Sequence, residues 1–222
     1  MNRLFAISDI HGCFDTFYEL VVNRVNLTKS DKLILLGDYI DRGAKSREVI
    51  DFIFDLISSG FDVVSLAGNH EAMLVDSFRD NFFLPLWLMN SGETTLESFK
   101  ISDVDQIEGK YIDFLTSLSY YHSSGKFLFV HAGFDDYATD PFSDIHGMIW
   151  ECHDIYNNPL LKGMTIIHGH RPKTIDQVKE RIKADSGVIP IDTGCVYDIE
   201  MGYGHLSALE VNSMKLISVE RI

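Results

Sequence analysis

The sequence has few cysteines and few prolines, and both scarcities exclude classes of protein. Its 222 residues include three cysteines, Cys13, Cys152 and Cys195, which are too scattered for a disulfide framework or a zinc ribbon. There are five prolines, and no Gly/Ser-rich run resembles a linker. We therefore expect one domain over residues 1–222 and reduced thiols, as in a cytoplasmic protein.

Long apolar runs are also missing. The longest, residues 82–89, contains Pro85 and falls well short of the roughly 18 residues that a membrane-spanning helix needs. The N-terminus leads directly into a charged strand and lacks the apolar stretch of a signal peptide. We expect no membrane partner.

Positive charge is scarce, because 19 Lys and Arg residues face 33 Asp and Glu residues, for a formal net charge of −14. Binding to a phosphate backbone needs clustered basic side chains, so we expect no nucleic-acid partner. Hydrophobic residues make up 45% of the chain, enough for a sizeable core. Bound divalent cations would offset part of the acidic excess.

Apolar periodicity in the first 70 residues predicts strands that alternate with helices. The strands are expected at residues 3–8, 32–36 and 62–66, and the helices at 14–24 and 46–58. Continuous apolar strands that alternate with amphipathic helices are typical of a parallel sheet covered on both faces. Ligands of such sheets bind beyond the carboxyl ends of the strands.

The rest of the chain changes character. Residues 70–118 are mostly helical in pattern, with a break at 91–93. Short strands follow, set off by turns, at residues 126–130, 164–167, 188–191, 206–211 and 216–219. We expect these strands of the second half to form a second, mixed sheet. The predicted fold class is α/β, with two mixed β-sheets packed as a sandwich and flanked by helices.

Possible metal ligands end five apolar runs. The segments are Ser8-Asp9-Ile10-His11-Gly12, Gly37-Asp38-Tyr39-Ile40-Asp41-Arg42-Gly43, Gly68-Asn69-His70-Glu71, Val130-His131-Ala132-Gly133 and His168-Gly169-His170-Arg171-Pro172. Unpaired charges are too costly to bury in a dry core, whereas divalent cations accept carboxylate, amide oxygen and imidazole. The candidate ligands are Asp9, His11, Asp38, Asn69, His131 and His170. This set fits a two-metal centre with ions roughly 3.5–4 Å apart.

Each segment alone is weak, because a single Asp or His at a strand end is more often a cap or a turn residue. Together and in this order, the segments resemble the calcineurin-like metallophosphoesterases. Within that family they resemble the phosphoprotein phosphatase branch, and especially small bacterial and phage enzymes typified by the phosphatase of bacteriophage lambda. Asn90-Ser91-Gly92-Glu93-Thr94-Thr95-Leu96 and Ile191-Asp192-Thr193-Gly194 also resemble segments of that bacterial branch.

The resemblance implies a role for each site residue. Asp9, His11 and Asp38 would hold one metal, and Asp38, Asn69, His131 and His170 the other. His70 would be the general acid, oriented by Asp41, and Arg42 would bind phosphate. These roles agree with the chemistry: two cations make hydroxide available from a bridging water for in-line attack, and a carboxylate beside His70 favours the imidazolium.

One position departs from the family, because Cys152 stands where a second phosphate-binding arginine is usual. Arg171 is a possible substitute, although an ordinary surface arginine is equally consistent with the sequence. For three further residues of the motifs we weigh structural roles. Glu71 is expected to brace its loop, His168 is expected to be structural, and Asp192 either orients an imidazole or caps a turn.

We expect a metal-dependent phosphomonoester hydrolase, namely a serine/threonine protein phosphatase that could have dual specificity. The expected cofactors are two divalent ions, manganese first, with iron, zinc, nickel and cobalt as alternatives. The expected partner is a phosphoprotein or phosphopeptide, and the expected state is a monomer. The missing arginine leaves open a diadenosine tetraphosphate hydrolase or a small phosphodiesterase. A non-catalytic phosphoprotein-binding relative is disfavoured, because the full ligand set is present.

Overall fold

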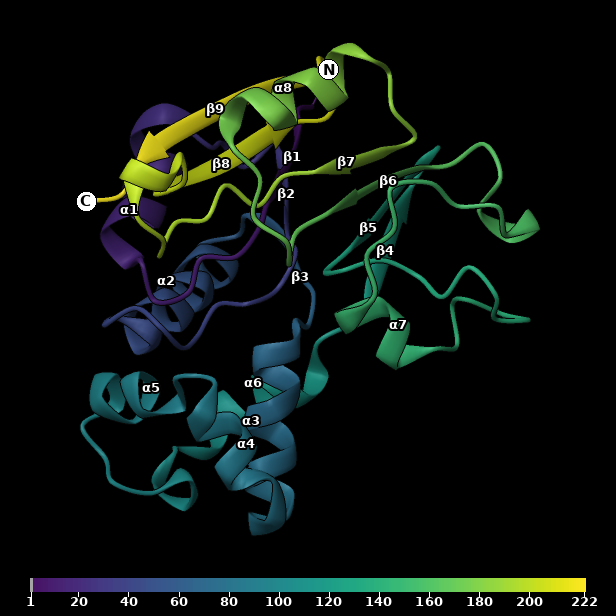
Figure 1. Ribbon diagram of the computed structural model, residues 1–222. Helices are drawn as coiled ribbons and strands as arrows, with labels where there is room; N and C mark the ends of the chain where they lie inside the picture. The colour runs from purple at the N-terminus through teal and green to yellow at the C-terminus, as the bar shows by residue number, and fades with distance from the viewer. Residues whose placement is uncertain (1) are drawn as a thin grey trace.

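The computed structural model describes residues 2–222, and two mixed β-sheets form its centre (Figure 1). The first sheet has the strand order β3-β2-β1-β8-β9, with β1 Leu4–Ile7, β2 Lys32–Leu35, β3 Asp62–Ser65, β8 His205–Glu210 and β9 Lys215–Glu220. The second has the order β4-β5-β6-β7, with β4 Tyr121–Ser124, β5 Phe127–Val130, β6 Thr165–His168 and β7 Val188–Pro190.

Parallel and antiparallel pairs occur in both sheets. Strands β1, β2 and β3 are parallel to one another, and β8 and β9 extend that sheet in antiparallel fashion. In the second sheet β5, β6 and β7 are parallel, and β4 is antiparallel to β5. The predicted class of two mixed sheets flanked by helices is confirmed.

One detail of the expected topology is wrong, because β8 and β9 belong to the first sheet. Strand β8 pairs with β1 in the register Ala6↔Leu209. Its four central residues are buried, as befits an interior strand covered on both faces. Strand β9 is more exposed along its length, which suits the edge of the sheet. The local apolar patterns predicted both strands but carry no information about which strand each one pairs with.

Helices cover the sheets. Helix α1 Phe14–Tyr18 continues into the π-helical turn η1 Glu19–Arg24. Helix α2 Ser46–Ser58 has the predicted bounds and ends just before Gly60, whose φ of +85° is left-handed as in many helix C-termini. The second half adds helices α7 Ile145–Trp150 and α8 Ile175–Lys183 and the turns η4 Pro159–Leu161 and η5 Ile199–Met201.

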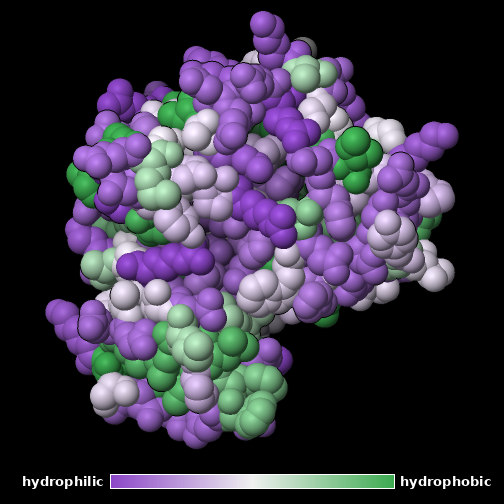
Figure 2. Space-filling view, in the orientation of Figure 1, coloured by the Kyte–Doolittle hydropathy of each residue, from purple (hydrophilic) through white to green (hydrophobic). Residues whose placement is uncertain are grey.

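A separate cluster of helices forms between β3 and β4 and lies below the sheets in Figure 1. It comprises α3 Asn69–Arg79, η2 Asn81–Phe83, α4 Leu84–Met89, α5 Gly92–Phe99, η3 Val104–Gln106 and α6 Gly109–Ser117. The predicted break is present, because Ser91 has a left-handed φ of 73° between α4 and α5. Apolar side chains gather on the surface of this region (Figure 2), where Phe82 and Met89 are 80% and 85% exposed.

The core between the sheets is built from alternate residues of both. It contains residues of β1, β2 and β8 on one side and of β5, β6 and β7 on the other, among them Ala6, Ile34, Leu209, Phe129, Ile167 and Ile189. Burial of a large apolar side chain contributes about 1.5–3 kcal/mol, so this interior holds the two sheets together. Within residues 2–222, no helix has the length and apolar character needed to cross a membrane. The single domain over residues 1–222 stays a prediction.

Candidate metal centre

The loops that follow β1, β2, β3, β5 and β6 meet at one edge of the sandwich, as the parallel strands require. Backbone hydrogen bonds join neighbouring loops: His11 N–H donates to the Asp38 carbonyl at 2.8 Å, and Gly169 N–H donates to the His131 carbonyl at 2.7 Å. The candidate ligands, which are far apart in the sequence, are therefore held on one frame by backbone hydrogen bonds between their loops.

Three candidate ligand atoms form a compact triangle. Asn69 Oδ1 lies 3.0 Å from His131 Nε2 and 3.1 Å from His170 Nδ1, and the two nitrogens are 3.1 Å apart. Ligand atoms at right angles around a cation, each about 2.1 Å from it, lie about 3.0 Å from each other. The triangle therefore has the size of one face of an octahedral shell, and these residues fit a divalent cation.

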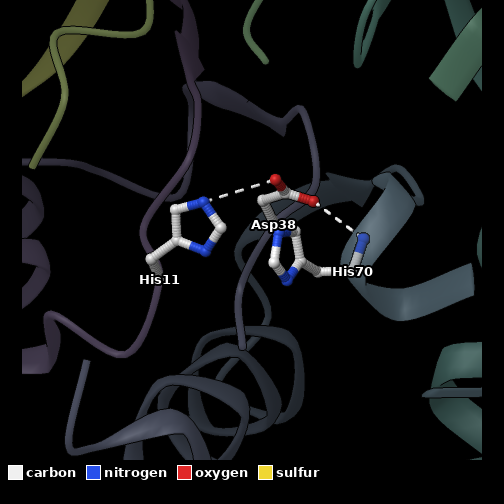
Figure 3. Close-up of side chains that lie close together, drawn as sticks. All are labelled: His11, Asp38 and His70. Atoms are coloured by element: carbon white, nitrogen blue, oxygen red, sulfur yellow. Dashed lines mark hydrogen bonds and ion pairs between the residues drawn. The ribbon is translucent and has the colours of Figure 1, made fainter. Parts of the chain in front are cut away.

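Asp38 connects this triangle to a second group. Its Oδ2 lies 3.6 Å from His131 Nε2 and 3.3 Å from His11 Nε2. Figure 3 shows Asp38 between His11 and His70, and ligand-type atoms of these three residues lie within 4.8 Å of one another. Asp38 is the residue shared by both groups, with His131 and His170 in the other. A carboxylate in this position can bridge two cations.

Asp9, the remaining predicted ligand, also connects two loops. Its carboxylate accepts hydrogen bonds from the His170 backbone N–H, at 3.0 and 3.1 Å, and from the Ser8 hydroxyl. Gly169 allows this approach, since a side chain there would collide with Ser8 and Asp9. Asp9 thus joins the loop after β1 to the loop after β6, and it lies outside both compact groups of ligand atoms.

The tautomers of two histidines follow from their partners. His11 Nδ1 lies 2.9 Å from the Ile40 carbonyl, and His131 Nδ1 lies 3.0 Å from the Leu36 carbonyl. A carbonyl oxygen only accepts, so each Nδ1 carries the proton and each Nε2 presents a lone pair to the cluster. This is the form that binds a metal.

Burial sets the electrostatics of the site. It lowers the pKa of His11 and of His170 to about 3, so both imidazoles are neutral. Burial also raises the pKa of Asp9 well above its usual value, and the nearby Asp192 and Asp38 carboxylates add to that rise. Crowded, buried carboxylates beside neutral imidazoles are an arrangement that a cation stabilises.

The site residues also share an unusual backbone conformation. Six of them have left-handed φ values between 45° and 68°: Asp9, His11, Asp38, Asp41, Arg42 and His170. Such a conformation costs on the order of 1 kcal/mol or more for a residue other than glycine, and it concentrates at functional sites. The loops therefore turn sharply enough to aim several side chains at one point.

Glu71 braces the loops, as expected. Its carboxylate accepts backbone N–H groups of Asp38 at 2.8 Å, Tyr39 at 2.8 Å and Gly68 at 2.9 Å. The oxygens are directed at the loop backbone, away from the ligand cluster. Glu71 therefore fixes the loop after β2 against the start of α3.

His70 and Asp41 form a buried pair, in which His70 Nδ1 lies 2.7 Å from Asp41 Oδ2. Burial alone would lower the pKa of His70, but the Asp38 and Asp41 carboxylates outweigh it, and the pKa is raised. His70 Nε2 is buried and has no hydrogen-bond partner among residues 2–222. That orphaned atom is suited to exchange a proton with a group that enters the site.

Arg42 is exposed beside the cluster. Its Nη1 lies 2.9 Å from His11 Nε2 and donates to the Tyr197 hydroxyl at 3.0 Å. Tyr197, on the loop after β7, did not stand out in the sequence, because nothing local marks a tyrosine that meets an arginine 155 positions away. The pair places a guanidinium and a phenol at the mouth of the site.

The position of the missing arginine is occupied by a neutral thiol. Burial raises the pKa of Cys152 to about 12, and its Sγ–H donates to the Ala132 carbonyl at 3.2 Å. Arg171 is exposed and lines a pocket of about 80 Å³ with Cys152 and Lys173. Arg171 and Cys152 are thus neighbours at this pocket.

The two remaining residues have local partners. Nδ1 of the buried His168 lies 3.0 Å from the Gly169 carbonyl. Asp192 Oδ1 accepts the Gly194 N–H at 2.8 Å, which is a turn cap. Of the two roles open to Asp192, the structure shows the cap.

Fold and site together define a class of metal-dependent phosphate-ester hydrolases. The model of the calcineurin-like phosphoesterase family matches residues 3–200, and the chain belongs to that family. The protein serine/threonine phosphatase of Saccharomyces cerevisiae has a similar fold, with a TM-score of 0.69 and 14% identity over 100% of this chain and 80% of that one.

The chain is similar in sequence to proteins named as protein phosphatases and to proteins named as bis(5'-nucleosyl)-tetraphosphatases. The chain is 27% identical to serine/threonine-protein phosphatase 2 of Salmonella typhimurium over 76% of this chain and 79% of that protein. It is 27% identical to the asymmetrical bis(5'-nucleosyl)-tetraphosphatase PrpE of Bacillus subtilis over 86% and 85%. It is 33% identical to the symmetrical bis(5'-nucleosyl)-tetraphosphatase of Aromatoleum aromaticum, but the match spans only 44% of that longer protein and 59% of this chain.

Proposed function

We propose that this metallophosphoesterase removes phosphate from phosphoserine and phosphothreonine in proteins or peptides. The observation that carries the proposal is the buried His70–Asp41 pair, in which His70 Nε2 has no partner within the described residues 2–222. A serine alkoxide is a poor leaving group and needs a proton as the ester bond breaks. A positioned imidazolium supplies that proton, whereas a nitrophenolate leaves without one.

The chain's own residues divide the work. The divalent cations, when bound, supply positive charge that binds phosphate oxygens and lowers the pKa of water. Asp9, His11, Asp38, Asn69, His131 and His170 would hold them. The Arg42 guanidinium presents a planar fork for phosphate oxygens, and the Tyr197 hydroxyl holds its Nη1. His70 delivers a proton from Nε2 while Asp41 holds Nδ1.

Several finer features belong to the same proposal. Mixed carboxylate, amide and imidazole ligands suit manganese, and also iron or zinc. Metal analysis of protein loaded in manganese should give two ions per chain. A monomer, a cytoplasmic location and the absence of nucleic-acid and membrane partners stay predictions. Arg171, beside Cys152, is proposed as the second phosphate-binding arginine.

The test replaces His70 by asparagine. We expect His70→Asn to lower kcat on a phosphoserine peptide by roughly 10²–10⁴-fold, the usual range for a general acid, and to leave kcat on p-nitrophenyl phosphate far less changed. Manganese content should stay the same. His146→Asn is a matched control, because that side chain is 72% exposed on α7. Equal losses on the two substrates would refute the acid role.

A second candidate is the hydrolysis of dinucleoside tetraphosphates. It is supported by the relatives that bear that name and by Cys152 at the position of the arginine. The two candidates are separated by turnover of diadenosine tetraphosphate and a phosphoserine peptide under the same manganese concentration. A kcat/KM at least tenfold higher for the dinucleotide would replace the first proposal by the second.

A further inference from the structure

The Asp41 carboxylate accepts hydrogen bonds from two side chains in addition to its contact with His70. Thr95 Oγ1–H donates to Oδ1 at 2.6 Å, and Trp87 Nε1–H lies 2.9 Å from Oδ2 and 3.2 Å from Oδ1. All four side chains are fully or almost fully buried. The carboxylate is therefore surrounded by donors on both oxygens.

The direction of each hydrogen bond can be assigned. Indole Nε1 is only a donor. The Thr95 hydroxyl accepts the Asp41 backbone N–H at 3.0 Å, so its own hydrogen is free to point at Oδ1. With its oxygens engaged in this way, Asp41 acts only as an acceptor toward His70. His70 Nδ1 must then carry the proton, and Nε2 faces the site.

The two donors come from the helical cluster and not from the metal-binding loops. Trp87 is on α4 and Thr95 is on α5, 46 and 54 positions after Asp41. Gly92 at the start of α5 permits the indole to sit there, since a Cβ on Gly92 would lie 2.6 Å from Trp87 ring carbons. The segment 90–96, which the metal centre does not use, is thus built to seat Trp87 and to present Thr95.

We propose that Trp87 and Thr95 are positioning residues, which orient Asp41 so that His70 holds its ring and tautomer for proton delivery. This inference rests on the proposed role of His70 as the acid. Neither residue is expected to touch phosphate or metal. Their removal should therefore change the protonation of the leaving group and leave substrate binding alone.

The experiment measures kcat and KM of Thr95→Val and Trp87→Phe, loaded with manganese, on a phosphoserine peptide and on p-nitrophenyl phosphate. We expect kcat on the peptide to fall roughly 10- to 100-fold, the range for one hydrogen bond to a charged group. On p-nitrophenyl phosphate the fall should be under about threefold. KM should stay the same, and Thr95→Ser, which keeps the hydroxyl, should restore kcat.

A matched control separates this role from general packing. Thr94→Val makes the same chemical change one residue earlier on α5, where the hydroxyl donates to the Ser91 carbonyl at 2.9 Å, and it should be silent. A double-mutant cycle is sharper still: in the His70→Asn background, Thr95→Val should have no further effect on kcat. A further loss there as large as in the wild type would overturn the proposal.

A spectroscopic measurement keeps the proposal testable whatever the substrate. In nitrogen-15 NMR of histidine-labelled protein, His70, assigned from its loss in His70→Asn, should show a protonated Nδ1. Thr95→Val and Gly92→Ala, which displaces Trp87, should shift that signal, whereas Thr94→Val should not. If wild-type protein hydrolyses neither substrate but shows these shifts, the proposed function fails and the positioning holds. An unchanged His70 signal in Thr95→Val refutes the positioning.

Discussion

Replacement of Glu71 by glutamine tests how far the metal centre depends on a residue that does not bind metal. The Glu71 carboxylate accepts backbone N–H groups of Asp38, Tyr39 and Gly68, with Oε2 serving Asp38 and Gly68 and Oε1 serving Tyr39. Glutamine keeps the shape but puts an NH₂ group in place of one oxygen. At least one N–H is then buried without an acceptor.

The magnitude follows from these contacts. Loss of one hydrogen bond to a charged group costs about 1.5–3 kcal/mol, and the remaining bonds weaken to the neutral value of about 1 kcal/mol each. Burial and the Asp38 charge raise the pKa of Glu71 to about 7, so removal of the charge recovers part of that loss. A net loss of about 2 kcal/mol lowers Tm by about 4–8 °C in a chain of this size.

The assay is thermal unfolding followed by circular dichroism, once with a chelator and once with manganese. A cation that binds only the folded state raises Tm, and by more the more tightly it binds. We expect Glu71→Gln to have a lower Tm than the wild type with the chelator. Because Glu71 holds the Asp38 backbone, the difference in Tm between the two proteins should be larger with manganese. Glu97→Gln, exposed on α5, is the control. A Tm within about 1 °C of the wild type in both conditions would refute the bracing role.

Two further predictions concern charge elsewhere in the fold. Hydrogen bonds from Arg3, assisted by Thr28, hold the pKa of the Asp31 carboxyl well below its usual range, so its contribution to stability is present above about pH 4 and is lost as pH falls further. Asp31→Asn should therefore lower the urea midpoint at pH 7 more than at about pH 2, where most of the contribution is lost, and equal shifts at both would contradict this. If Arg171 does not bind the phosphate, Cys152→Arg should raise kcat/KM on phosphomonoesters roughly 10-fold, because it adds one charge-assisted hydrogen bond. If Arg171 does bind it, Arg171→Ala should lower kcat/KM by that amount and Cys152→Arg should change it little. Steady-state kinetics of both variants distinguish these two outcomes. If neither variant changes kcat/KM, the hypothesis of a second phosphate-binding arginine is refuted.

The sequence predicted those parts of the molecule that local pattern controls. The apolar periodicity of the sequence predicts strands β1 to β3 and helix α2. The ends of β2 and β3 place Asp38 and Asn69 at the site. Pairing across the sheet is not local, so β8 was assigned to the wrong sheet. A buried strand beside β1 and one in the second sheet have the same apolar pattern.

The sequence likewise predicted site residues only where their type is unusual for the position. Asp and His at strand ends stand out, because a dry core excludes them. Trp87 does not, since a tryptophan in an apolar run is ordinary, and Thr95 lies in a segment whose resemblance to the bacterial branch does not say what the threonine contacts. Their meaning depends on Asp41, which only the folded chain brings to them.

The left-handed backbone of the site has a practical consequence for anyone who engineers this protein. At Arg42 and His170, whose φ values are 68° and 67°, glycine would relieve a conformational cost of about 1 kcal/mol each, while removing the side chain that acts there. A library selected only for heat resistance, without added metal, will therefore favour glycine at these positions and accumulate stable, inactive proteins. Selection has to be coupled to phosphate release from the first round.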